Sequence, residues 1–162
     1  MRALRRHFTG FTLVELLVVL AIVGILAAFG LPLMGNTVAN NRIDNGADQL
    51  AASFRYARAE AISSGIPTDV CSSSDGATCT GGNWNLGWIV TRNVGGTAEV
   101  LQAVTPSTKV TFTNPVTVIT FNSLGIVAAP AGVPVNTFGV SDSSSTLTRS
   151  ITVSQIGKVS KL

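Results

Sequence analysis

The stretch "GFTLVELLVVLAIVGILAAFGLP", residues 10–32, decides how this chain is organised. The chain carries no charged residue from Leu16 to Leu33, which is enough for one crossing of a bilayer as a helix. Glu15 stands at the beginning of this apolar run, where a carboxylate costs free energy unless it finds a partner. The sequence therefore predicts a membrane-spanning helix in which the charge of Glu15 calls for a functional explanation.

Basic residues are distributed unevenly around this helix. Arg2, Arg5 and Arg6 precede the apolar run and no cation follows it directly, which predicts a cytoplasmic N-terminus and an outward-facing remainder. A cleaved secretory signal also begins with basic residues, and "ILAA" at residues 25–28 offers a cleavage site of that kind. The apolar run is long for such a signal, and Glu15 would be a handicap within one.

The overall composition describes a folded chain rather than a disordered one. Of its 162 residues, 46% are hydrophobic and 12% are charged, with a formal net charge of +3. Beyond residue 10, eight basic residues face eight acidic ones, so the first ten residues hold the excess positive charge. The exception is the C-terminal tail, where Arg149, Lys158 and Lys161 follow Asp142 with no acid among them.

After Pro32 the apolar pattern changes from continuous to periodic. Residues 34–64 are predicted to form an amphipathic helix, which Gly65 would cap and Pro67 could not continue. Asp44, Asp48 and two arginines are expected on its other faces. The apolar residues at three- and four-residue spacing are Ile43, Ala47, Leu50, Ala51, Phe54, Ala57 and Ala61.

Residues 65–162 are predicted to form a β-rich globular head. Short segments rich in β-branched and aromatic residues alternate with glycine- and proline-containing turns. Such segments favour an antiparallel sheet with one face on the apolar stripe of the helix. Trp88 is expected in this core, whereas Trp84 fits either the core or a surface contact. The expected strands are 86–92, 98–104, 109–112, 116–121, 137–140, 147–154 and 158–162.

The two cysteines, Cys71 and Cys79, flank a short polar loop. No second cysteine pair and no nearby histidine would complete a zinc site, so a disulfide or two free thiols are the alternatives. A disulfide would require an oxidising compartment, in agreement with an outward-facing head.

The N-terminal residues resemble the class III leader and first helix of type IV prepilins and type II secretion pseudopilins. A short basic leader, residues 1–10, ends at Gly10, and Phe11 and Glu15 follow at the spacing of that motif. The resemblance implies that a prepilin peptidase cleaves between Gly10 and Phe11 and that Phe11 is N-methylated. It also implies that residues 11–33 are a transmembrane helix, that Pro32 kinks it, and that Glu15 pairs with the N-terminal amine of a neighbouring subunit.

Two further stretches, "RYARAEAISSGIPTDVC" and "CTGGNWNLGWIVTRNVGG", resemble minor pilins of the FimT/FimU-like group, which share a domain with GspH-type minor pseudopilins. The implied fold class is α+β and pilin-like, with a long N-terminal helix on an antiparallel sheet. The implied function is that of a minor pilin of a type IV pilus, with a minor pseudopilin of a type II secretion system as the alternative. The implied partners are other pilins or pseudopilins, prepilin peptidase and the bacterial inner membrane, with the head in the periplasm and later in a cell-surface pilus.

Catalysis is not expected from this inventory of residues. The one histidine, His7, lies in the leader, and the carboxylates of the head form no local motif. No phosphate loop, dinucleotide fingerprint or metal-spaced cluster occurs, so neither a cofactor nor a metal is predicted.

The tail "RSITVSQIGKVSKL" resembles the C-terminal "GRxR" element with which some FimT-like pilins bind DNA. Gly157 and Lys158 match its first two positions, Ser160 replaces the second arginine, and Lys161 is displaced by one residue. That displacement turns a side chain to the opposite face of a strand. Arg149, Lys158 and Lys161 are therefore candidates for double-stranded DNA binding in natural transformation, and solubilising surface charge is the alternative.

Overall fold

One long helix contributes residues to both of the compact units into which the chain divides. The computed structural model describes residues 11–114, 116–130 and 135–162, without the side chains of residues 27–34 and 135. The first unit ends at Thr37 and the second covers Val38–Leu162, which we call the head unit. Helix α1, Leu13–Ser64, contributes residues to both. The predicted leader, residues 1–10, lies outside the described residues.

Helix α1 ends where the sequence places a glycine. Gly65 has a φ of +70°, a left-handed conformation that a residue without a Cβ adopts at little cost. Its N–H donates to the carbonyl of Ala61 at 3.1 Å, which satisfies one of the last carbonyls of the helix. The predicted end of the helix at Ser64 is confirmed.

The strands of the head unit form two antiparallel sheets, where the sequence predicted one. A five-stranded sheet has the order β3–β2–β1–β5–β6, and a four-stranded sheet has the order β4–β7–β8–β9. Periodicity locates strands but does not specify their partners, which is why the division into two sheets was missed. The strands are β1 Thr68–Ser72, β2 Trp88–Val94, β3 Thr97–Val104, β4 Val110–Thr113, β5 Val118–Phe121, β6 Val127–Ala129, β7 Val135–Asp142, β8 Thr148–Ser154 and β9 Val159–Lys161.

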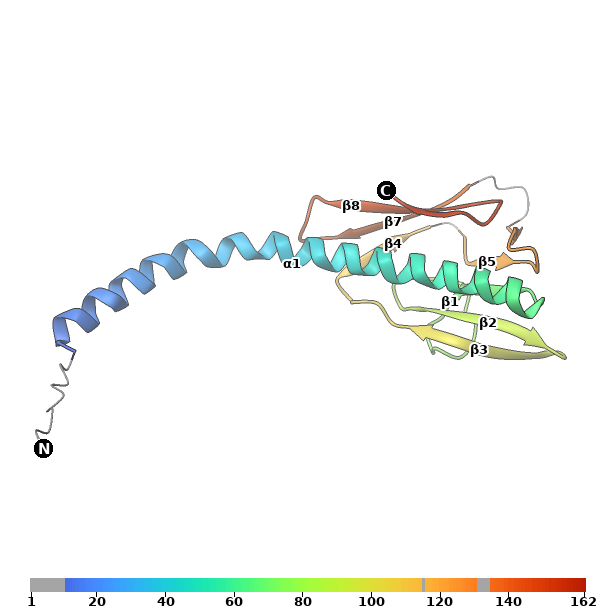
Figure 1. Ribbon diagram of the computed structural model, residues 1–162, viewed down its shortest axis with the longest axis horizontal. Helices are drawn as coiled ribbons and strands as arrows, with labels where there is room; N and C mark the ends of the chain where they lie inside the picture. Colours follow the sequence, from blue (N-terminus) through green and yellow to red (C-terminus); the bar gives the residue numbers. More distant parts are fainter. Residues whose placement is uncertain (1–10, 115, 131–134) are drawn as a thin grey trace, which may run out of the picture. The chain divides into compact units, whose positions relative to one another are not determined.

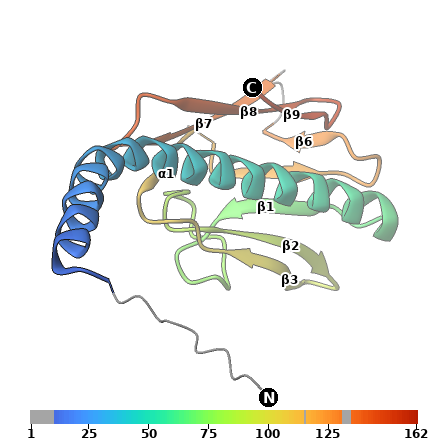
Figure 2. The same ribbon diagram turned by 60° about the vertical axis from the view of Figure 1, so that its left-hand side comes forward.

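The C-terminal half of α1 lies over both sheets. Figures 1 and 2 agree that β7 and β8 lie on one side of this helix and that β2 and β3 lie on the other. The predicted apolar face is confirmed, because all seven of its residues have no exposed surface. Gly46 lets the four-stranded sheet lie close to the helix, since a Cβ there would lie 3.2 Å from Cγ1 of Val110 on β4. The missing side chain at this position thus helps α1 to fit against that sheet.

A cluster of aromatic side chains fills the space between α1 and the sheets. The ring of Phe138 lies 5.0 Å from those of Phe54 and Trp84, and the ring of Trp88 lies 5.3 Å from that of Phe112. Trp84 is 2% exposed, so of its two predicted positions, core or surface contact, it occupies the core.

Both indole N–H groups in this cluster are satisfied, as buried donors require. Nε1 of Trp88 donates to Oγ of Ser53 at 2.9 Å, and Nε1 of Trp84 donates to the carbonyl of Val116 at 2.7 Å. Trp84 could not be placed from the sequence because its partner is a backbone carbonyl 32 residues away.

Candidate functional site

The N-terminal end of α1 carries the residues predicted for processing and assembly. Gly10 lies outside the described residues. Phe11 is 82% exposed, and Glu15 is exposed in the first turn of the helix. The backbone N–H of Glu15 donates to Oγ1 of Thr12 at 3.3 Å. Thr12 thus caps the helix, and Glu15 places a negative charge where the helix dipole favours one.

The cap at Thr12 was not predicted, although the sequence carries a signal for it. The pattern Thr12–x–x–Glu15 is that of a capping box, in which residues three apart satisfy the first N–H groups of a helix. Glu15 therefore has a local role in its own chain besides the intersubunit role that the resemblance implies.

Apolar side chains surround α1 in the first unit. Every residue from Phe11 to Leu26 is exposed, including Leu16 at 57%, Leu20 at 58% and Leu26 at 66%. Among the residues that the structure describes, no helix is both long and apolar enough to cross a membrane. The predicted transmembrane segment, residues 11–33, and the predicted kink at Pro32 both reach into residues 27–34, whose side chains lie outside the described part. Both stay predictions.

The predicted disulfide is present. Cys71, on β1, is bonded to Cys79, and the bond closes the loop between them. Asp75 organises this loop: its carboxylate accepts hydrogen bonds from the backbone N–H groups of Ala77 and Thr78 and from the hydroxyls of Ser73 and Thr78, at 2.7–2.9 Å. These donors, the backbone N–H of Thr78 first, lower the pKa of Asp75 well below its ordinary value.

The basic tail is opposed by acids from α1, which corrects one expectation from the sequence. Nε of Arg149 lies 2.8 Å from Oδ1 of Asp44, and Nζ of Lys161 lies 2.7 Å from Oδ1 of Asp48. Lys161 pairs in register with Ile151, a fully buried residue, and so shares the face of the sheet that looks toward α1. The carboxylates that pair with the tail come from residues more than 100 positions earlier in the chain.

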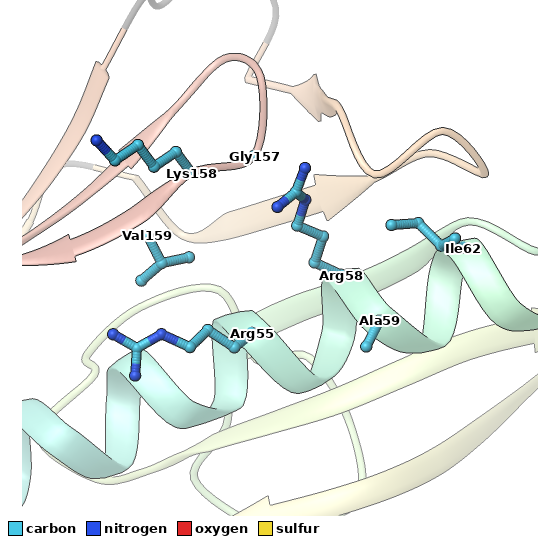
Figure 3. A pocket seen from close by; sticks show the side chains of 7 residues that line it. All are labelled: Arg55, Arg58, Ala59, Ile62, Gly157, Lys158 and Val159. Atoms are coloured by element: carbon cyan, nitrogen blue, oxygen red, sulfur yellow. The ribbon is translucent and has the colours of Figure 1, made fainter.

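Lys158, the third tail cation, lies in a different setting. It is exposed, and with Gly157 and Val159 it lines one side of a pocket of about 350 Å³. The opposite side is α1, through Arg55, Arg58, Ala59 and Ile62 (Figure 3). We call these seven residues the basic pocket.

Arg58 connects α1 to one turn from each sheet. Its Nε donates to the carbonyl of Gly125 at 3.0 Å, and its Nη2 donates to the carbonyl of Ile156 at 3.2 Å. Gly157 has a φ of +76°, and a Cβ there would collide with the carbonyl of Gly125 and with Arg58. Arg58 is one of the two arginines, with Arg55, that the sequence predicts on the other faces of the helix, and no local pattern signals these long-range contacts.

Within the described residues, no group of three or more histidine, cysteine, aspartate or glutamate side chains is arranged to hold a metal ion. The candidate functional features of the described residues are therefore an exposed apolar helix, a loop closed by a disulfide and a pocket lined by basic residues. Together with the buried face of α1 and the two antiparallel sheets, they define the class of protein as pilin-like.

The chain belongs to the family described as "Type II transport protein GspH", whose model matches residues 46–157. A second model, the prokaryotic N-terminal methylation motif, matches residues 5–31. The predicted resemblance to FimT/FimU-like minor pilins and GspH-type pseudopilins is thus confirmed, and the family is structural rather than enzymatic.

The chain is also similar to type IV fimbrial proteins. The type IV major fimbrial protein FimA of Dichelobacter nodosus is 35% identical over 98 residues, which are 60% of this chain and 58% of the relative. The chain therefore spans less than two thirds of the length of this relative.

Two solved structures share the fold. The type IV minor pilin FimU of Pseudomonas aeruginosa matches with a TM-score of 0.58 at 24% identity, over 74% of this chain and 91% of that one. The minor pseudopilin EpsH of the Vibrio cholerae type 2 secretion system matches with a TM-score of 0.54 at 13% identity, over 75% and 96%. The predicted α+β, pilin-like fold class is confirmed.

Proposed function

We propose that this chain is a minor pilin of a type IV pilus, a structural subunit that is inserted in the inner membrane and then assembled into a filament. The observation that carries the proposal is the exposure of every side chain from Phe11 to Leu26, nearly all of them apolar. So much apolar surface requires lipid or other apolar helices around it. A subunit that passes from a bilayer into a helical filament has both environments in succession.

Processing follows from the same proposal. A prepilin peptidase would cleave between Gly10 and Phe11, and the new amine of Phe11 would be methylated. The exposure of Phe11 and the start of the helix directly after Thr12 support access of such an enzyme to Phe11. Residues 11–33 would hold the precursor in the inner membrane, with the head unit in the periplasm.

Glu15 would serve assembly in this proposal. Its carboxylate is exposed in the first helical turn and lies among apolar side chains. A positively charged amine of a neighbour would compensate it when both enter the filament.

Mass spectrometry of the protein from its native host tests the processing. The expected mature chain lacks residues 1–10 and carries one methyl group on Phe11. An intact leader, or a mature chain that begins near Phe29, would contradict the proposal.

A second experiment tests the role of Glu15. Glu15→Ala should leave the amount of membrane-inserted protein unchanged and remove the chain from the sheared filament fraction. Glu99→Ala, which removes a half-exposed carboxylate from β3 of the head unit, is the matched control and should retain incorporation. Loss of insertion in Glu15→Ala would assign the carboxylate to insertion instead.

A minor pseudopilin of a type II secretion system is the second candidate. The family description and the fold shared with EpsH favour it. A deletion strain separates the two candidates: loss of surface pili supports the first, and retention of exoprotein in the periplasm with normal pili supports the second.

DNA binding through Arg149, Lys158 and Lys161 remains a weaker proposal. Asp44 and Asp48 neutralise two of these three cations, and one unpaired lysine would give only weak, salt-dependent contact with phosphates. The full chain in detergent micelles, mixed with duplex DNA at about 50 mM salt, where phosphate contacts are only weakly screened, provides the test. Retardation that Lys158→Ala plus Lys161→Ala abolishes would support DNA binding, and its absence in the wild type would end the proposal.

A further inference from the structure

The free positive charge of the head unit is concentrated at the basic pocket. Four basic side chains of the described residues lie within ion-pair distance of a carboxylate: Arg42, Arg92, Arg149 and Lys161. The other four are Arg55, Arg58, Lys109 and Lys158, and three of these line the basic pocket. Three cations without a carboxylate partner around one hollow make its surroundings positive, which favours an anionic group on the partner surface.

The pocket is partly preorganised. Two backbone carbonyls, of Gly125 and Ile156, fix the guanidinium of Arg58 between α1 and the β8–β9 turn. Figure 3 shows Arg58 pointing from α1 toward this turn, with Arg55 one turn earlier on the same helix and Lys158 on the turn itself. A fixed guanidinium loses little freedom when an anion arrives, which improves affinity for a given number of contacts.

Exposed apolar side chains border the pocket. Ile62 lines it and is 51% exposed. Leu124 and Ile156 are 72% and 68% exposed. They belong to the two turns whose carbonyl groups accept hydrogen bonds from Arg58. A Cβ on Gly125 would lie 2.6 Å from Cδ1 of Ile62, so the turn of Leu124 packs directly against the pocket wall. Cations and large apolar groups are therefore interleaved on one surface.

This mixture identifies the kind of partner. Protein interfaces combine apolar anchors with arginine, whereas nucleic-acid interfaces are more polar and more uniformly positive. We propose that the basic pocket docks a carboxylate-bearing, partly apolar surface of a different pilin-type subunit, an inference that rests on the proposed assembly function. A second copy of the head unit is a poorer fit, because each of its side-chain carboxylates already has a partner within its own chain: Asp44, Asp48, Glu60, Asp69, Asp75, Glu99 and Asp142.

Site-specific crosslinking of the full chain in its native host tests the proposal. A photoreactive benzophenone residue replaces Ile156, whose side chain is exposed at the edge of the pocket. Illumination should give an adduct with a pilin-type protein, and mass spectrometry should place the crosslink near an aspartate or glutamate of that protein. Arg55→Glu plus Lys158→Glu should lower the yield of adduct by about tenfold or more, because like charges would then face each other.

Two controls make this result specific. Lys109→Glu reverses the charge of the fourth cation, which lies outside the pocket, and should leave the yield of adduct at the wild-type level. Lys158→Glu alone, which reverses one charge at the pocket, should lower it. Replacing the crosslinked carboxylate of the partner by lysine should restore the yield in the chain that carries Lys158→Glu. Each variant is compared at equal protein level and equal disulfide content.

The outcomes separate this inference from the assembly function. Equal yields in the pocket variants and in Lys109→Glu would overturn the inference, as would an adduct that nuclease removes, or no adduct while the wild-type chain co-purifies with filaments. Absence of the wild-type chain from filaments would overturn the proposed function itself, independently of the charge dependence of the adduct.

Discussion

The two parts of helix α1 differ in where their apolar side chains go. In residues 13–26, Leu16 and Leu20 are more than half exposed, while in the head unit Ile43, Leu50 and Phe54 are completely buried. The first part is apolar on all sides, and the second is apolar on one face only. The period of the sequence pattern thus tells whether a helix is covered by its own chain or by something outside it.

The largest expected effect breaks this contrast in the head unit. Phe54→Ala removes a fully buried ring that contacts the rings of Trp84 and Phe138, and should lower the free energy of unfolding by about 3–5 kcal/mol. Leu20→Ala, in the first unit, should change it by less than about 0.5 kcal/mol, because it is a surface position within its own chain.

Urea unfolding of the full chain in detergent micelles, followed by tryptophan fluorescence, measures both variants. Trp84 and Trp88 lie in the head unit, so the signal reports the stability of that unit alone. Equal losses in the two variants would mean that the exposed part of α1 contributes to the folded head, contrary to the comparison.

The next effect concerns the loop closed by Cys71 and Cys79. Replacing both cysteines by serine should lower the free energy of unfolding by about 2–3 kcal/mol, because a loop with a sequence separation of 8 is no longer constrained in the unfolded chain. The same urea titration, with reduced wild type as the control, measures it. An unchanged midpoint would show that Asp75 and its hydrogen bonds hold the loop without the disulfide.

Local sequence signals were sufficient for the helix but not for the pairing of strands. The spacing of Ile43 to Ala61 identified the buried face of α1, and Gly65 identified its end. Strand β1, which follows the helix directly, was not predicted. It lies at the centre of its sheet, between β2 and β5. Its neighbours come from residues 88–94 and 118–121, and no local pattern encodes such distant partners.

The same limit applies to the charged residues. The sequence correctly identified the cysteine pair and the excess of cations in the tail. It could not show that Arg149 and Lys161 would meet Asp44 and Asp48, or that Arg55 and Arg58 would join Lys158 at one pocket. Both outcomes depend on β8 and β9 being placed beside α1, and therefore on the tertiary fold.

A smaller effect is expected at the ion pairs of the tail. A double-mutant cycle with Arg149→Ala and Asp44→Ala should give a coupling free energy of about 0.2–1 kcal/mol, since both side chains are about one third exposed. The coupling should decrease between low and high salt, because exposed charges are screened. No coupling at low salt would mean that Arg149 is free, and would return it to the candidates for phosphate contact.

The last effect is a pH dependence, which is expected for a variant in the head unit and not for one in the exposed part of α1. The pKa of Asp75 is lowered in the folded chain by hydrogen bonds from Thr78 and Ala77, so its stabilising contribution is complete above about pH 5 and is lost as the pH falls through the folded pKa. Asp75→Asn removes this titration. The difference in unfolding free energy between wild type and Asp75→Asn should therefore shrink as the pH falls from 5 toward 2, whereas the difference between wild type and Leu20→Ala should stay constant. Parallel curves for wild type and Asp75→Asn over this range would show that the ionised carboxylate does not hold the loop, and that its order comes from the disulfide alone.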